Sequence, residues 1–211
     1  MLAVGRILAI ALGICSHILH AGTLDQSHTD GSGNAGAPFL AQTFTVGIGG
    51  FLDQVDIEVD LLANATLEIR PTVAGVPALG GTALGEVLVP DDVPNGNRTF
   101  VSVDLASLNI AVNPGDQLAI VLVFEELGST ALWVLGGDGY SGGHGYFSTS
   151  SSSWEMYDPP GDFNFRTYVI PEPSAAVLTA LGFVCLLAWR CKNDQPLSRL
   201  THISRICVPI R

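Results

Sequence analysis

The sequence predicts an all-β protein, a β-sandwich of jelly-roll topology, followed by a single C-terminal transmembrane helix. Three observations point to this fold. The middle of the chain holds short stretches in which apolar and polar residues alternate, and clusters of turn-forming glycine, proline and aspartate separate them. No helical period longer than two turns interrupts these stretches. A continuous apolar run near the C-terminus predicts the transmembrane helix.

The clearest alternation is residues 55–61, Val-Asp-Ile-Glu-Val-Asp-Leu, whose apolar side chains should face a core and whose acidic ones should face water. Residues 66–70 repeat the pattern with Leu67 and Ile69 inward. Residues 117–124 are almost wholly apolar, which is typical of a central strand. The other expected strands are 40–46, 99–104, 131–135, 146–149 and 163–169. The polar segment around His28 predicts a loop.

About eight short strands with turns between them favour a jelly roll. The turns are marked by runs such as Asn113-Pro-Gly-Asp116 and Asp158-Pro-Pro-Gly-Asp162. No repeat of fixed period is present, and a solenoid or a propeller is therefore not expected.

The predicted domain, residues 23–168, is strongly acidic. It holds 18 acidic residues against three basic ones, Arg70, Arg98 and Arg166, and it has no lysine. Such a surface repels phosphates, so we expect no nucleic-acid partner. The four cysteines, Cys15, Cys185, Cys191 and Cys207, all lie outside the domain. A disulfide, a cysteine zinc site and a thiol nucleophile are therefore excluded from it.

The N-terminus has the pattern of a secretory signal peptide, which we assign to residues 1–22. Arg6 supplies the positive charge, an apolar run follows from Ile7, and the small residues Ala21 and Gly22 mark the cleavage region.

The C-terminal region predicts a membrane anchor. Residues 175–189 form an uninterrupted apolar run of 15 residues, about 23 Å long as a helix at roughly 1.5 Å per residue. A span this short crosses a bilayer if Trp189 and Arg190 snorkel and the bilayer thins. Arg190 and Lys192 follow the run and favour a cytoplasmic C-terminus.

The tail resembles the PEP-CTERM sorting domain, which is also catalogued as the C-terminal domain of ice-binding proteins. The resemblance covers residues 169–192: Pro171, Glu172 and Pro173, then the span 175–189, then Arg190 and Lys192. It implies export by a Gram-negative bacterium, transient anchoring, and recognition of Pro171, Glu172 and Pro173 by an exosortase that cleaves near them. The basic residues would be the retention charges. Residues 193–211 extend beyond the usual end of that family and are expected to form a short cytoplasmic tail.

The stretches that match catalytic motifs lack the neighbouring elements and partner residues that catalysis needs. We therefore expect no enzymatic activity. Residues 139–143 fit G-x-S-x-G, but no helix is expected after them, and the only later histidine apart from His144 lies beyond the span. The stretch from Asp30 begins like a calcium loop, yet alanines occupy the positions that an EF-hand gives to glycine and glutamate. A glycan-active enzyme with paired carboxylates is a further alternative, which needs a cleft between the two acids.

No cofactor is required by the sequence, but Ca²⁺ has candidate ligands. Asp138, Asp158 and Asp162 lie on late loops, and Asp91 and Asp92 lie in a turn. Carboxylate oxygens suit this hard cation. The alternative is that these residues form Asx-turns, which need no metal.

The same late segment gathers aromatic residues among glycines and serines. Tyr140, His144, Trp154 and Tyr157 are candidate ligand-binding residues, because aromatic faces with nearby polar groups stack on sugar rings. The alternative is that aromatic side chains such as Trp154 and Tyr146 fill the core.

The sequence therefore predicts an exported, non-enzymatic protein of the cell surface or the extracellular matrix. Its expected partners are the membrane, an exosortase-type enzyme and polysaccharide. The alternative is a carbohydrate-binding module.

Overall fold

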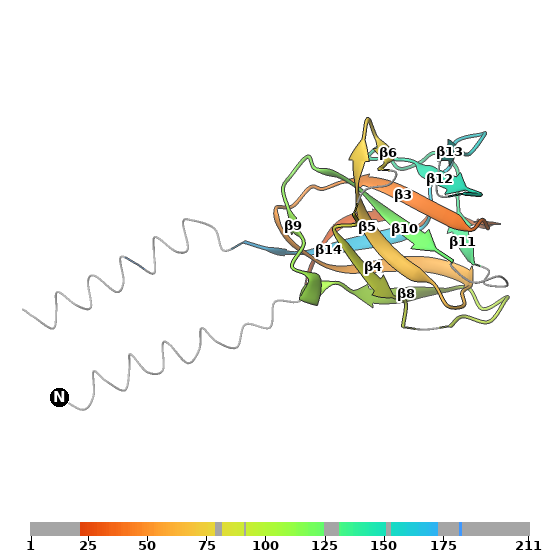
Figure 1. Ribbon diagram of the computed structural model, residues 1–211, viewed down its shortest axis with the longest axis horizontal. Coiled ribbons are helices and arrows are strands. Elements are labelled where there is room, and N and C mark those ends of the chain that lie inside the picture. The colour runs from red at the N-terminus through yellow and green to blue at the C-terminus, as the bar shows by residue number, and fades with distance from the viewer. Residues whose placement is uncertain are drawn as a thin grey trace, which may run out of the picture. The chain divides into compact units, whose positions relative to one another are not determined.

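The computed structural model describes residues 22–78, 82–90, 92–124, 131–150, 153–172 and 182. The chain divides into two compact units, Met1–Glu172 and Pro173–Arg211. The described residues of the first unit form an all-β domain with two antiparallel sheets (Figure 1). The all-β prediction is thus confirmed, and the two sheets face one another in the manner of a β-sandwich.

The first sheet has the strand order β1-β14-β4-β11-β2 within the described residues, and β8 and β9 pair with the other edge of β4. The strands are β1 (Thr23–His28), β2 (Gly33–Ala35), β4 (Gly50–Leu61), β8 (Thr99–Asp104), β9 (Ala111–Val112), β11 (Leu132–Leu135) and β14 (Phe165–Pro171).

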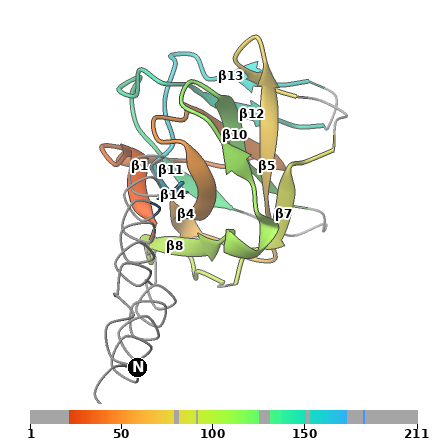
Figure 2. The ribbon, with the colours of Figure 1, turned by 90° about the vertical axis from the view of Figure 1, so that its left-hand side faces the viewer.

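The second sheet has the order β13-β12-β3-β10-β5-β6 over the same part of the chain, with β7 also paired to β5. Figure 2 shows these strands gathered opposite β1, β14, β4 and β8. The strands are β3 (Phe39–Thr45), β5 (Thr66–Val73), β6 (Val76–Pro77), β7 (Gly85–Leu88), β10 (Gln117–Val123), β12 (Gly145–Ser148) and β13 (Glu155–Met156); a short 3-10 helix, η1, covers Ala106–Leu108.

The main core lies between the two sheets. It is formed by the apolar residues of the strands whose sequences alternate, as predicted. All eight predicted strands are present, and most of their ends differ by no more than two residues. The exceptions are β4, which begins five residues earlier than expected, and β5, which ends three residues later. Val55, Ile57 and Val59 on β4 are fully buried, as are Leu67 and Ile69 on β5. Burying one such side chain stabilises the fold by about 1.5–3 kcal/mol.

Strand β10 is buried on both faces, as its apolar run predicts. Ile120 and Leu122 face the main core, whereas Ala119 and Val121 belong to a second, smaller apolar cluster. Tyr146 and Trp154 help to form that second cluster, so the sheet is covered on this side as well.

The expectation of a loop around His28 is wrong. Residues 23–28 form β1, which pairs antiparallel with β14, and His28 ends this strand with 6% of its surface exposed. This edge strand is held to β14 by backbone hydrogen bonds and not by apolar side chains. Its sequence therefore does not need the usual alternation of apolar and polar residues. The Nε2 atom of His28 is buried and has no hydrogen-bond partner.

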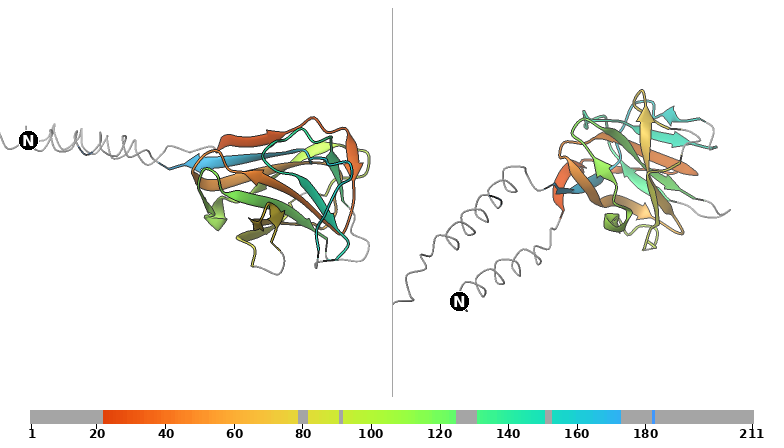
Figure 3. Two further views of the ribbon diagram at one scale, coloured as in Figure 1. Left: turned by 90° about the horizontal axis from the view of Figure 1, so that it is seen from above. Right: turned by 60° about the vertical axis from the view of Figure 1, so that its left-hand side comes forward.

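Strand β14 lies between β1 and β4 and is hydrogen-bonded to both. Figure 3 shows it, in blue, lying along the domain. Because β1 and β14 are antiparallel and Thr23 pairs with Val169, the start of β1 and the end of β14 lie side by side. The loop that precedes β14 lies at the opposite end of these strands.

Candidate functional site

The best-defined polar cluster lies at the start of β14 and is built around Asp162. This side chain is fully buried. Its Oδ2 atom accepts hydrogen bonds from the backbone N–H groups of Gly139 at 3.0 Å and Tyr140 at 2.9 Å. Asp162 therefore fastens the loop that follows β11 to the segment that leads into β14.

Gln42 completes the support of Asp162, and sequence reasoning missed it. It is 0% exposed on β3, between the core residues Leu40 and Phe44. Its Nε2 atom donates to Asp162 Oδ1 at 3.1 Å, and its Oε1 atom accepts from the backbone of Phe163 at 2.7 Å. A glutamine where the alternation requires an apolar residue is the signal that could have revealed it.

His144 is held against β3 by its backbone. Its N–H donates to Thr43 Oγ1 at 2.9 Å, and its carbonyl accepts from the Thr43 N–H at 3.0 Å. The preceding residue must be glycine, because a Cβ atom on Gly143 would lie 1.9 Å from the Thr43 carbonyl oxygen. The imidazole Nδ1 of His144 is buried without a hydrogen-bond partner, 3.6 Å from Asp138 Oδ1.

The side chains of Asp138, His144 and Asp162 form a group that can hold a divalent cation. One donor atom of each lies within 4.8 Å of the others. All three basic side chains of the described residues, Arg70, Arg98 and Arg166, have other partners. One imidazole nitrogen with two carboxylate oxygens is a donor set for Zn²⁺ or Mn²⁺ more than for Ca²⁺, which prefers oxygen alone.

This donor set differs from the predicted calcium ligands by one residue. Asp138 and Asp162 come together as expected, but the third member is His144. Asp158 is exposed and lies outside the group. Asp92 accepts a hydrogen bond from the backbone of Asn64 at 3.2 Å, and Asp91 lies outside the described residues.

We expect Zn²⁺ or Mn²⁺ to raise the melting temperature of the protein, and Ca²⁺ to raise it less. A cation at a hundred times its dissociation constant stabilises the fold by about 2.7 kcal/mol, which corresponds to roughly 5–10 °C. His144→Ala should remove the increase, whereas Asp158→Ala should keep it. A melting temperature that no cation changes would show that Asp162 serves only to fasten the loop.

The four candidate ligand-binding residues divide into two groups. Tyr140 is 9% exposed and packs edge-on against Phe165, with ring centroids 5.2 Å apart. Tyr157 packs between the rings of Phe147 and Phe163, at 4.8 and 5.7 Å. These two tyrosines belong to the main core, so their ring faces are not free to stack on a ligand.

Burial also governs how these tyrosines titrate. Desolvation raises the pKa of Tyr140 to about 12 and that of Tyr157 to about 12. Because the folded pKa exceeds the unfolded value of 10, the stability that each gives is complete below pH 10 and is lost as the pH rises toward 12. Denaturant titrations at increasing pH should therefore show a steep loss above pH 10. Tyr157→Phe should reduce that loss, and an unchanged loss would contradict the assignment.

His144 and Trp154 remain nearer the surface. His144 lines a pocket of about 480 Å³ between the β5–β6 turn and the loop at 141–144. Tyr146 and Met156 also line this pocket, and the Tyr146 hydroxyl donates to the Gly75 carbonyl at 3.2 Å. Trp154 covers the second apolar cluster, and its Nε1 atom is buried without a partner.

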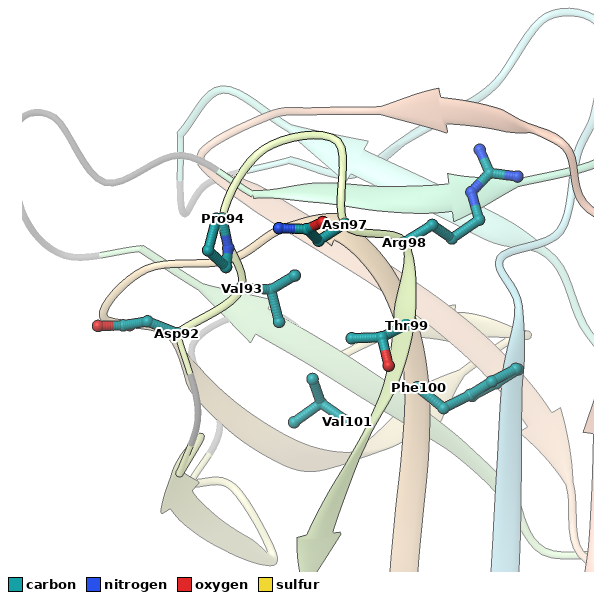
Figure 4. A pocket seen from close by; sticks show the side chains of 8 residues that line it. All are labelled: Asp92, Val93, Pro94, Asn97, Arg98, Thr99, Phe100 and Val101. Atoms are coloured by element: carbon teal, nitrogen blue, oxygen red, sulfur yellow. The ribbon is translucent and has the colours of Figure 1, made fainter.

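A second pocket, of about 490 Å³, lies beside β8, and of the predicted site residues Asp92 lines it. Figure 4 shows Val93, Thr99 and Val101 directed toward its centre, whereas Arg98 points away. Arg98 donates to the carbonyl of Ser32 and to Asn34 Oδ1, both at 3.0 Å. Its charge is therefore directed at β2 and the residue before it, and not into the pocket.

The expected sorting motif begins where the described domain ends. Pro171 is the last residue of β14, and Glu172 is exposed. Pro173, Arg190 and Lys192, and with them the predicted signal peptide up to Ala21, lie outside the described residues. The same holds for the predicted span 175–189, apart from Gly182. Among the residues that the structure does describe, no helix has the length and apolar character needed to cross a membrane.

No family model, curated protein or solved structure matches this chain.

Proposed function

We propose that this chain is an exported, non-enzymatic protein of the cell surface or the extracellular matrix, carried there with a C-terminal sorting anchor. In this proposal a signal peptide directs export, residues 175–189 cross the membrane, and an exosortase-type enzyme acts at Pro171, Glu172 and Pro173. The folded domain is the part that is displayed.

The observation that carries the proposal is the position of the two ends of the domain. Strand β1 begins at Thr23, directly after the expected signal peptide, and β14 ends at Pro171, inside the expected sorting motif. Thr23 and Val169 are paired residues of neighbouring strands. A leader and an anchor that insert into one membrane both need to leave the domain on one side, and this pairing satisfies that need.

The strand order supports the jelly-roll part of the proposal. Four strands of the first sheet run β1-β14-β4-β8, and four of the second run β3-β10-β5-β7. Most successive main strands therefore alternate between the sheets, as two Greek keys folded together require. Jelly rolls are common in lectin and capsid domains, so the fold suits a displayed binding protein without defining its ligand.

The local structure of the G-x-S-x-G stretch speaks against a nucleophile elbow there. Residues 139–143 lead into β12, a strand that begins at Gly145, where a nucleophile elbow needs a helix. Asp162, the most buried carboxylate of this region, accepts three hydrogen bonds that hold the fold.

The alternative is a carbohydrate-binding module, and fewer of its four candidate ligand-binding residues remain accessible than the sequence predicts. Tyr140 and Tyr157 are committed to the core, and the hypothesis therefore depends on His144, Trp154 and the pocket near Tyr146. Calorimetric titration of the exported protein with a panel of bacterial polysaccharides would test it, and binding that His144→Ala abolishes would favour this alternative.

The export proposal is tested by the intact mass of the protein in the membrane and medium fractions of its own cells. We expect a released species whose last residue lies between Pro171 and Ser174. A membrane-bound species that keeps peptides beyond Arg190 would contradict sorting by cleavage and would indicate a stable anchor.

A further inference from the structure

Gly22 makes a specific contact one residue before β1 begins. Its backbone nitrogen donates a hydrogen bond to Asp53 Oδ2 at 3.1 Å. A Cβ atom at this position would lie 2.6 Å from that oxygen and 2.9 Å from Tyr168 Cβ, so only glycine fits. The nitrogen of residue 22 is therefore placed against a carboxylate by the fold itself.

Asp53 has no cationic side chain as a partner among the described residues. Arg70 pairs with Glu68, Arg166 with Asp56, and Arg98 donates to Ser32 and Asn34. The Asp53 carboxylate accepts its hydrogen bond from the Gly22 nitrogen. In a domain this acidic, a positive charge at that atom would be strongly favoured.

We propose that processing cleaves the bond between Ala21 and Gly22, and that the new α-ammonium group of Gly22 forms an ion pair with Asp53. Water is the co-reactant: its oxygen joins the Ala21 carbonyl carbon, the C–N bond breaks, and Gly22 nitrogen takes up protons. A free α-amino group has a pKa of about 8 and is charged at neutral pH. This inference rests on the export proposal and places the processing site one residue earlier than the end of the expected signal peptide, residues 1–22.

The ion pair would make the exported domain more stable than its precursor. Before cleavage the Gly22 nitrogen is an amide that donates one neutral hydrogen bond. After cleavage the same atom carries a full charge, and charge-assisted hydrogen bonds are roughly twice as strong as neutral ones. The gain would arise only once the leader is removed, when the chain has crossed the membrane and no longer needs to remain unfolded.

The chain offers a selective probe of this group. Its one lysine, Lys192, lies beyond the sorting motif, so a released domain has a single amine, the α-amino group. Acetylation of that amine restores an amide like that of the precursor. Since the precursor chain itself continues from this nitrogen, the acetyl group does not need new space there.

The experiment uses the protein released by its own cells, first by intact mass and then by thermal unfolding before and after acetylation. We expect Gly22 as the first residue and a decrease of about 1–3 °C on acetylation. Asp53→Asn should lose most of this decrease, and Glu86→Gln, an exposed acidic residue on β7, should keep it.

Two results would overturn the inference and leave export in place: a leader removed at another bond, or equal decreases in the wild type and in Asp53→Asn. A displayed protein that still contains residues 1–21 would instead contradict the proposed function as well.

Discussion

Trp133→Ala is expected to lower the free energy of unfolding of the protein by about 3–5 kcal/mol. Trp133 is fully buried on β11, stacked on Phe163 with ring centroids 4.4 Å apart. Its Nε1 atom donates to the Asn164 carbonyl at 2.8 Å. The Asn164 carbonyl keeps its hydrogen bond from the Glu58 N–H, so the loss comes mainly from the removed ring and the cavity it leaves. It is a large share of the roughly 5–15 kcal/mol by which whole domains are stable.

Urea denaturation followed by circular dichroism measures this loss. Leu88→Ala is the matched control, because Leu88 is 68% exposed on β7 and should change the free energy of unfolding by less than about 0.5 kcal/mol. If Trp133→Ala lost no more than this control, the stacked pair would not be part of the core.

Asp162→Ala should be the second most damaging substitution, although it removes only a small side chain. Three hydrogen bonds to this carboxylate would be lost, from the backbone N–H groups of Gly139 and Tyr140 and from the Gln42 amide. The Gly139 N–H and the Gln42 amide each keep one other acceptor, a backbone carbonyl. Hydrogen bonds to a charged group contribute about 1.5–3 kcal/mol each, and with partial relaxation of the loop we expect a loss of about 3–5 kcal/mol. The metal response should disappear as well.

Asp162→Asn separates the structural role from metal binding. Its amide oxygen can still accept from Gly139 and Tyr140, but its amide nitrogen cannot accept from Gln42, so only part of the lost stability should return. The lost charge should weaken any cation effect by tenfold or more. Urea titrations with and without Zn²⁺ measure both quantities, and Asp158→Ala should match the wild type in each. Equal stability of the alanine and asparagine variants would contradict the role of Asp162 as an acceptor.

The parts of the fold that follow from a local pattern could be predicted. Residues 55–61 and 66–70 have a strict period of two, and their apolar members are almost all in the core. Asp56 departs from the pattern: it was expected to face water, yet it is 5% exposed. The Tyr168 hydroxyl donates to its carboxylate and Arg166 lies 3.8 Å from it, and both contacts depend on the pairing of β14 with β4.

The candidate site could be predicted only in part, because its residues are brought together by contacts between distant segments of the chain. Asp138 and Asp162 are 24 positions apart, and their meeting depends on how the loop after β11 folds back toward β14. Gln42 comes from a third region of the chain. Strand β1 was missed because its sequence, Thr-Leu-Asp-Gln-Ser-His, has no apolar face, and only pairing with β14 makes it a strand.

The position of β14 also has a mechanical consequence. A pull on the chain at Glu172 enters the domain at Pro171 and is transmitted along β14, which is bonded to β1 on one side and β4 on the other. The hydrogen bonds of antiparallel pairs lie perpendicular to the strands. Tension along β14 therefore loads these bonds in shear, all together, instead of peeling them apart one at a time. A tether attached at this strand would withstand drag from flowing liquid better than one attached at a free edge.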